Sequence, residues 1–91
     1  MRTREKSYAD YGITPAESNE ILDFCKTEGA QDTIKAALIV VPSRYTAELL
    51  FESLTEGKSY DQLNENEDLI VSKVDFYGYR RKVMAKIKET M

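Results

Sequence analysis

The sequence contains no histidine, no tryptophan and a single cysteine, Cys25. Without histidine, the chain lacks the commonest general base and the commonest zinc ligand. One cysteine cannot form an internal disulfide, so the sequence carries no disulfide framework of the kind found in secreted domains. We therefore expect no enzyme, no metal and no cofactor. Cys25 stands beside Ile21, Leu22 and Phe24, which predicts a small core residue rather than a nucleophile.

Long apolar runs are also missing. The longest, "AALIVV" from Ala36 to Val41, has six residues, whereas a membrane-spanning helix needs about 20. The first residues, "MRTREKSYADYG", carry no apolar segment and do not resemble a signal peptide. We expect a cytoplasmic protein without membrane contact. The four glycines stand singly, so the sequence has no glycine-rich phosphate loop.

What remains is a small globular chain rich in charge. Its 91 residues, 42% apolar with nine aromatic side chains, suit one folded domain spanning residues 1–91. We expect residues 1–12 to form a flexible N-terminal arm. Carboxylates at helical spacing, such as Glu17 and Glu20 or Glu48 and Glu52, are typical of solvated helix faces and not of a catalytic pair.

Helix start and stop signals recur along the chain. Thr14, Pro15 and Glu17 form a capping box with a first-turn proline, and Gly29 would end that helix. Apolar residues repeat at i, i+3, i+4 and i+7 in the next two segments, which predicts two further helices. The first of these has Ile34, Ala37, Leu38 and Val41 and ends at Pro42; the second has Ala47, Leu50, Phe51 and Leu54 and ends at Gly57.

Two more helices complete the expected fold. Ser59 with Gln62 is a second capping box, and Ser72 would cap a last helix running to about Lys88. "DLIVSKV" alternates weakly, so a strand at residues 68–74 stays open as an alternative. We predict an all-α bundle of four to five helices with a C-terminal helix-turn-helix-like pair. The predicted core joins Leu38, Leu50, Phe51, Leu63, Phe76 and Val83.

Charge is spread unevenly along the sequence. Residues 1–71 carry seven Lys/Arg and fourteen Asp/Glu, a balance of −7, while residues 72–91 carry six and two, a balance of +4. Such asymmetry suggests contact with nucleic acid or another anionic surface. Ordinary surface exposure and a protein partner stay open as alternatives.

A helical wheel divides the last helix into two faces. Phe76, Tyr79, Val83 and Ile87 fall on one arc and should face the core. The neighbouring arc carries Lys73, Tyr77, Arg81, Met84 and Lys88, and Lys82 and Lys86 flank the other side of the apolar stripe. Gly78 inside the helix suggests a close approach by a DNA phosphate, a crossing helix or a kink.

The segment "LTEGKSYDQL … IVSKVDF" resembles the helix-turn-helix of sigma-factor region four and of phage transcriptional regulators of the RinA/ArpU type. The resemblance covers residues 54–88 and rests on Gly57, Ser59, Tyr60, Leu63, Val71 and Ser72. The connection from Leu63 to Ser72 is longer than in that family, and "NENED" makes it acidic.

This resemblance implies a DNA-binding transcriptional regulator or accessory protein of phage or mobile-element origin. It implies that Lys73, Val74, Tyr77 and Arg81 touch DNA, with Lys73, Tyr77 and Arg81 in or beside the major groove. Ser59 and Tyr60 would lie near a phosphate. Arg80, Lys82 and Lys88 complete the predicted contact set. The alternative is a non-enzymatic protein-protein interaction module that uses the aromatic and basic last helix for a partner or a homodimer.

Overall fold

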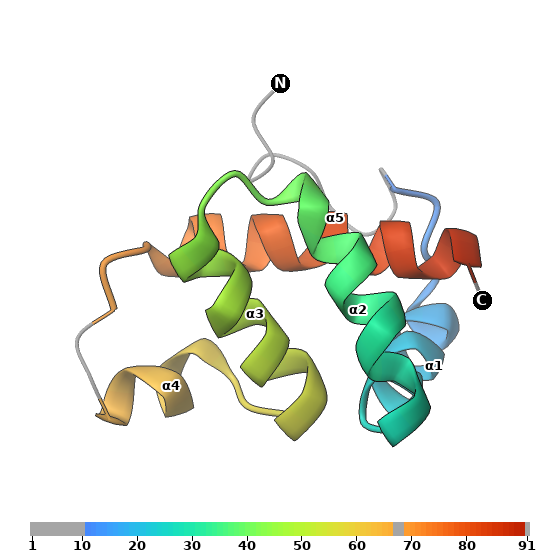
Figure 1. Cartoon of the computed structure of the whole chain (residues 1–91), viewed down its shortest axis with the longest axis horizontal. Helices are drawn as coiled ribbons and strands as arrows, with labels where there is room; N and C mark the ends of the chain where they lie inside the picture. The colour runs from blue at the N-terminus through green and yellow to red at the C-terminus, as the bar shows by residue number, and fades with distance from the viewer. Residues whose placement is uncertain (1–10, 67–68, 91) are drawn as a thin grey trace.

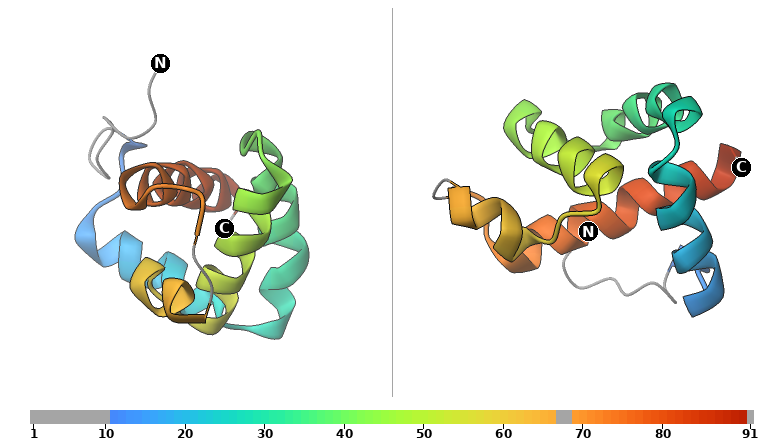
Figure 2. Two further views of the ribbon diagram at one scale, coloured as in Figure 1. Left: turned by 90° about the vertical axis from the view of Figure 1, so that its left-hand side faces the viewer. Right: turned by 90° about the horizontal axis from the view of Figure 1, so that it is seen from below.

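The longest helix, α5 (Lys73–Thr90), lies across the whole molecule, and the other helices pack against it (Figure 1). The computed structural model describes residues 11–66 and 69–90. α1 (Pro15–Cys25), α2 (Gln31–Ala37), α3 (Arg44–Glu56) and α4 (Tyr60–Asn66) precede α5, and 3₁₀ turns at Glu28–Ala30 and Leu38–Val40 flank α2. Figure 2 shows α5 nearly end-on, with α2 and α3 to one side of it.

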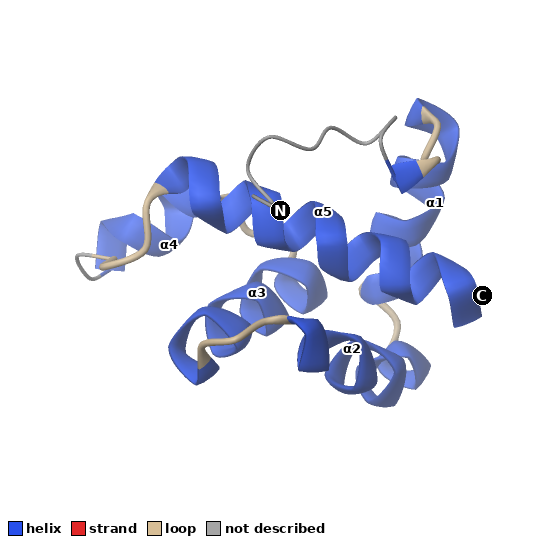
Figure 3. Ribbon diagram, turned by 90° about the horizontal axis from the view of Figure 1, so that it is seen from above, coloured by secondary structure: helices blue, strands red, loops and turns tan. Residues whose placement is uncertain are grey.

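The prediction of an all-α fold is confirmed. Helices and loops make up all of the described residues, with no strand among them (Figure 3). The strand alternative is wrong for its described part, because residues 69–72 form an irregular link and Lys73 begins α5.

Side-chain caps fix three helix starts where the sequence predicted them. At α1 the backbone N–H of Thr14 donates to Glu17 Oε1 (3.0 Å) and that of Glu17 donates to Thr14 Oγ1 (3.2 Å). The same reciprocal pair joins Ser59 and Gln62 at α4. Ser72 Oγ accepts from a backbone N–H in the first turn of α5 at 3.2 Å. These bonds satisfy amides that a helix start leaves without partners.

The helix ends agree less well with prediction. α1 stops at Cys25 and not at Gly29, because Thr27 Oγ1 donates to the Phe24 carbonyl (2.7 Å) and competes with the helical bond there. Gly29 lies in the following 3₁₀ turn. Gly57 does end α3 as predicted, with a left-handed φ of 69° that glycine adopts without strain.

The second predicted helix is shorter than expected. α2 ends at Ala37 and continues as the 3₁₀ turn Leu38–Val40. Val41 is extended, with φ −93° and ψ 121°, because the ring of Pro42 disfavours the helical conformation in the preceding residue. The apolar repeat therefore predicted an α-helix about one turn longer than the α-helix in the structure.

The buried face of α3 is rotated from the predicted one. Leu50 and Leu54 are buried as expected, but Ala47 and Phe51 are only half-buried. Leu49, which the prediction left out, is buried instead. The centre of the apolar face thus lies nearer Leu49 and Leu50 than the repeat suggested.

α5 buries a wider face than predicted. Phe76, Val83 and Ile87 are fully buried, which confirms three of the four expected core residues, while Tyr79 is half-buried. Met84 was placed on the cationic arc, and this was wrong, because its side chain is fully buried. Because α1, α2, α3 and α4 all contact α5, a narrow apolar stripe on α5 is not wide enough to pack against all four.

Gly78 is buried inside the fold. A DNA phosphate cannot approach a buried backbone position closely, so that alternative for Gly78 is wrong. A crossing helix and a kink stay open as reasons for the glycine.

The expected flexible arm, residues 1–12, lies outside the described residues apart from Tyr11 and Gly12. These two are not free. Tyr11 packs against the core, and the Gly12 carbonyl accepts a hydrogen bond from Lys88 Nζ.

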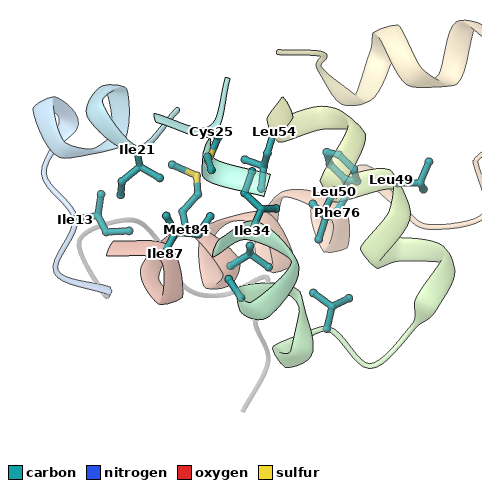
Figure 4. Close-up of a cluster of buried hydrophobic side chains, with 14 of the residues drawn as sticks. Ile13, Ile21, Cys25, Ile34, Leu49, Leu50, Leu54, Phe76, Met84 and Ile87 are labelled. Atoms are coloured by element: carbon teal, nitrogen blue, oxygen red, sulfur yellow. The ribbon is translucent and has the colours of Figure 1, made fainter. Parts of the chain in front are cut away.

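The buried side chains form one cluster that runs along α5 (Figure 4). Leu50, Leu63, Phe76 and Val83 belong to it as predicted, whereas Leu38 and Phe51 only pack against its edge. Cys25 is fully buried, which confirms its prediction as a core residue. Ile13, Ile21 and Ala30 extend the cluster at its α1 and α2 end and were not predicted as core residues.

Candidate nucleic-acid interface

The start of α4 and the first half of α5 meet, although they are far apart in sequence. The backbone N–H of Tyr60 donates to Tyr77 Oη (3.0 Å), and Tyr60 Oη donates to the Val71 carbonyl (2.6 Å). The ring of Phe76 lies between them, in edge contact with Tyr60 at 5.3 Å and with Tyr77 at 5.2 Å. Ser59, one residue earlier, is fixed by its capping bonds to Gln62. Three predicted contact residues therefore share one surface.

Lys73 lies on the same surface and has a carboxylate partner. Its Nζ is 3.1 Å from Asp61 Oδ2, and the Lys73 side chain is 55% exposed. The hydrogen bond to Asp61 raises the pKa of Lys73 above its ordinary value. Asp61 thus offsets part of the positive charge that this surface would offer to a phosphate.

Lys88 lies at the other end of α5. Fifteen residues separate it from Lys73, a distance of about 22 Å along a helix. Lys88 Nζ is 2.9 Å from Glu17 Oε2, so it joins α5 to the start of α1. The structure does not bring Lys88 together with Ser59, Tyr60 and Tyr77.

The Glu17–Lys88 pair gives the protein a specific dependence on pH. The hydrogen bond from Lys88 lowers the pKa of Glu17 below its ordinary value of 4.5. A carboxyl with a lowered folded-state pKa stabilises the fold fully above its unfolded-state pKa, and this contribution disappears as the pH falls through the folded-state value. Glu17→Gln keeps the capping acceptor but removes the charge, so its melting temperature should lie below that of the wild type at neutral pH.

The difference between wild type and Glu17→Gln should shrink as the pH falls below about 4.5. Thermal unfolding followed by circular dichroism across this range measures it. Lys88→Gln should reproduce the effect, and the double variant should lose little more than either single variant. A difference that stays constant with pH would contradict the pairing.

Arg80 is half-buried on α5, and part of its guanidinium is enclosed by the protein. Its guanidinium lies 5.5 Å from the centre of the Tyr77 ring. Its Nε is buried and has no hydrogen-bond partner among the described residues. Burial raises the pKa of the Cys25 thiol to about 11, and the positive charge of Arg80 acts in the opposite direction. Arg80 therefore reaches toward the end of α1.

The other predicted contacts on α5 differ in exposure. Val74 is 56% exposed, and Ile70 in the link before α5 is 84% exposed. Arg81 and Lys82 are half-buried on α5. Ile70 and Val74 thus expose apolar side chains on either side of Lys73 in the sequence.

Sequence reasoning missed Lys26 and Lys58. Together with Arg80 and Ser59 they line a pocket between α1, α3, α4 and α5. Gly57, predicted as a helix end, and Gln62, predicted in a capping box with Ser59, line the same pocket. The cations come from three separate segments, so no short motif could reveal them.

The connection between α4 and α5 is longer than that of a typical helix-turn-helix. Residues 67–72 separate Asn66 from Lys73, six residues where such a motif uses about three or four. Residues 67 and 68, in the acidic part of this link, lie outside the described residues.

Among residues 11–66 and 69–90, no helix has the length and apolar character needed to cross a bilayer. The same residues contain no group of three or more carboxylate or thiol side chains placed to hold a metal ion.

No protein-family model, curated protein or solved structure matches the chain.

Proposed function

We propose that the protein is a non-enzymatic DNA-binding protein that docks duplex DNA on the surface formed by the start of α4 and the first half of α5. The observation that carries this proposal is the hydrogen bond from the Tyr60 N–H to Tyr77 Oη at 3.0 Å. It joins the two segments that the resemblance assigns to DNA contact, with Lys73 beside them. A transcriptional regulator or accessory protein is the class that fits this surface.

Charge supports DNA as the ligand. The last twenty residues carry a balance of +4 in a chain of net charge −3. On α5 itself, Lys82 makes no ion pair with any described residue, whereas Lys73, Lys86 and Lys88 each have a carboxylate within 3.2 Å. Asp61 on the docking surface and the acidic link would weaken the binding of one protomer. We therefore expect the active form to be a dimer or a larger complex.

The proposal is tested by titrating fluorescently labelled duplex DNA with the full chain at several salt concentrations. The logarithm of the binding constant should fall linearly with the logarithm of salt concentration, by about 0.9 per phosphate neutralised. Binding that is absent, or that does not depend on salt, would contradict the proposal.

Substitutions on α5 separate base contacts from phosphate contacts. Arg81→Ala should cost about 1–3 kcal/mol on the preferred sequence if Arg81 reads a base. Lys82→Ala or Lys86→Ala should weaken binding to all sequences alike and reduce the salt slope. Lys35→Gln on α2 removes the same charge away from this surface and is the matched control.

A protein-protein interaction module is the second candidate, and the exposed side chains of Ile70 and Val74 favour it. A partner held by these two residues and Tyr77 would bind with little dependence on salt. Ile70→Ser would then abolish binding, whereas it should change DNA affinity only slightly.

A further inference from the structure

A basic pocket of about 190 Å³ opens between the end of α1, the end of α3, the start of α4 and the middle of α5. Three of its nine lining residues are cations and none is acidic, although the chain as a whole carries net charge −3. The lining residues are Leu22, Lys26, Ser53, Leu54, Gly57, Lys58, Ser59, Gln62 and Arg80. The three cations around this pocket create a local positive potential, although the protein as a whole is acidic.

Arg80 is the innermost of these cations. Its Nε is buried without a hydrogen-bond acceptor among the described residues, and its guanidinium lies 5.5 Å from the centre of the Tyr77 ring. A buried guanidinium N–H without an acceptor lowers the stability of the fold, because it has lost its hydrogen bond to water and gained no other. An oxyanion in the pocket would supply the missing acceptor, and Arg presents its N–H groups in a fork that suits phosphate oxygens.

Lys26 is the second uncompensated cation. It forms no ion pair with any described residue, and its side chain lies along the pocket wall at Gly57. Its Cε is 3.2 Å from the place where a Cβ on Gly57 would stand. Any larger residue at position 57 would push Lys26 away from the pocket.

Lys58 differs from the other two, because two carboxylates hold it. Its Nζ is 3.5 Å from Glu52 and 3.4 Å from Glu56, and these charges raise its pKa. Counting the two carboxylates, the surroundings of the pocket carry one net positive charge. That matches the single negative charge of one phosphodiester in a nucleic-acid backbone.

Ser59 supplies a polar group at the rim. Its Oγ accepts from the Gln62 N–H (3.2 Å), which leaves its hydroxyl proton available to donate. Three backbone N–H groups at the start of α4 have partners already, since Ser59 donates to Gln62, Tyr60 donates to Tyr77 and Gln62 donates to Ser59. The site therefore consists of side chains and does not depend on the helix start.

From this geometry we infer that the pocket binds a phosphate group, held by Arg80 and Lys26 with the Ser59 hydroxyl at the rim. The phosphate comes from a nucleic-acid backbone, because the pocket adjoins the Tyr60–Tyr77 surface. This choice of source rests on the proposed function, whereas the phosphate site itself does not.

The experiment titrates inorganic phosphate into the ¹⁵N-labelled full chain at constant ionic strength and follows the amide resonances. Saturable shifts should appear around Gly57, Ser59 and Arg80. Arg80→Gln and Lys26→Gln should each weaken phosphate binding about tenfold or more, while Lys35→Gln, a cation outside the pocket, should not. Since Arg80 is partly buried, the exposed Lys26 provides a variant that tests the site even if Arg80→Gln unfolds the protein.

The outcomes separate this site from the proposed function. Absent shifts, or shifts that all variants share, overturn the phosphate site even if DNA still binds. Acetate binding as tightly as phosphate also overturns it and assigns the pocket to a carboxylate of a protein partner. Saturable phosphate binding with no DNA binding upholds the site, overturns its backbone source and points to free phosphate. Weaker DNA binding in Lys26→Gln, together with lost phosphate shifts, supports both.

Discussion

Replacing Phe76 with alanine should destabilise the protein by about 3–5 kcal/mol. The Phe76 side chain is fully buried and contacts the rings of Tyr60 and Tyr77 edge-on. It therefore joins the start of α4 to α5 as well as filling the core. Its removal leaves a cavity that these side chains can fill only by giving up the Tyr60–Tyr77 hydrogen bond. The loss should be among the largest of any single truncation in this chain.

Urea denaturation of Phe76→Ala and wild type measures this difference. Val74→Ala, two residues earlier on the same helix and 56% exposed, is the control and should change stability by only about 0.5 kcal/mol. A Phe76→Ala variant nearly as stable as the wild type would mean that α4 does not dock on α5 as described. Its DNA binding should also fall, because the docking surface depends on the same contact.

The helix starts could be predicted from sequence because their chemistry is local. A capping box needs two side chains three residues apart, and the pairs at Thr14 and Ser59 both formed. Gly57 was predictable for the same reason, since it ends α3 with its own left-handed backbone. Each of these signals is complete within one helical turn.

The buried faces were harder to predict, because they depend on what packs against each helix. Met84 was assigned to the cationic arc, yet it is fully buried. An apolar period locates one stripe, and α5 is contacted on several sides by four helices. The ion pairs Lys73–Asp61 and Lys88–Glu17 were missed for a related reason, since their partners come from other helices.

The candidate site shows the same limit. Ser59, Tyr60, Lys73 and Tyr77 were predicted as contacts, and the structure brings them to one surface. Arg80 was predicted with them as a surface residue, but its guanidinium turns inward to a pocket. That pocket is assembled from four helices, so the sequence positions of its residues do not reveal it.

The contrast between Leu50 and Phe51 tests where α3 faces. Leu50 is fully buried, whereas Phe51 is half-buried at the edge of the core with Lys35 Nζ 5.7 Å from its ring centre. Leu50→Ala should therefore cost about 2–5 kcal/mol. Phe51→Ala should cost only about 1–2 kcal/mol, because less of its area leaves water on folding.

Chemical denaturation of the two variants under the same conditions measures both costs, and each serves as the control for the other. Side-chain size alone would make Phe51→Ala the more destabilising variant, since phenylalanine buries more area than leucine when both are fully enclosed. The apolar repeat of the sequence treats the two residues as equal members of one face. A larger cost for Phe51→Ala than for Leu50→Ala would therefore show that α3 turns that predicted face toward α5, and that Leu49 lies outside the core.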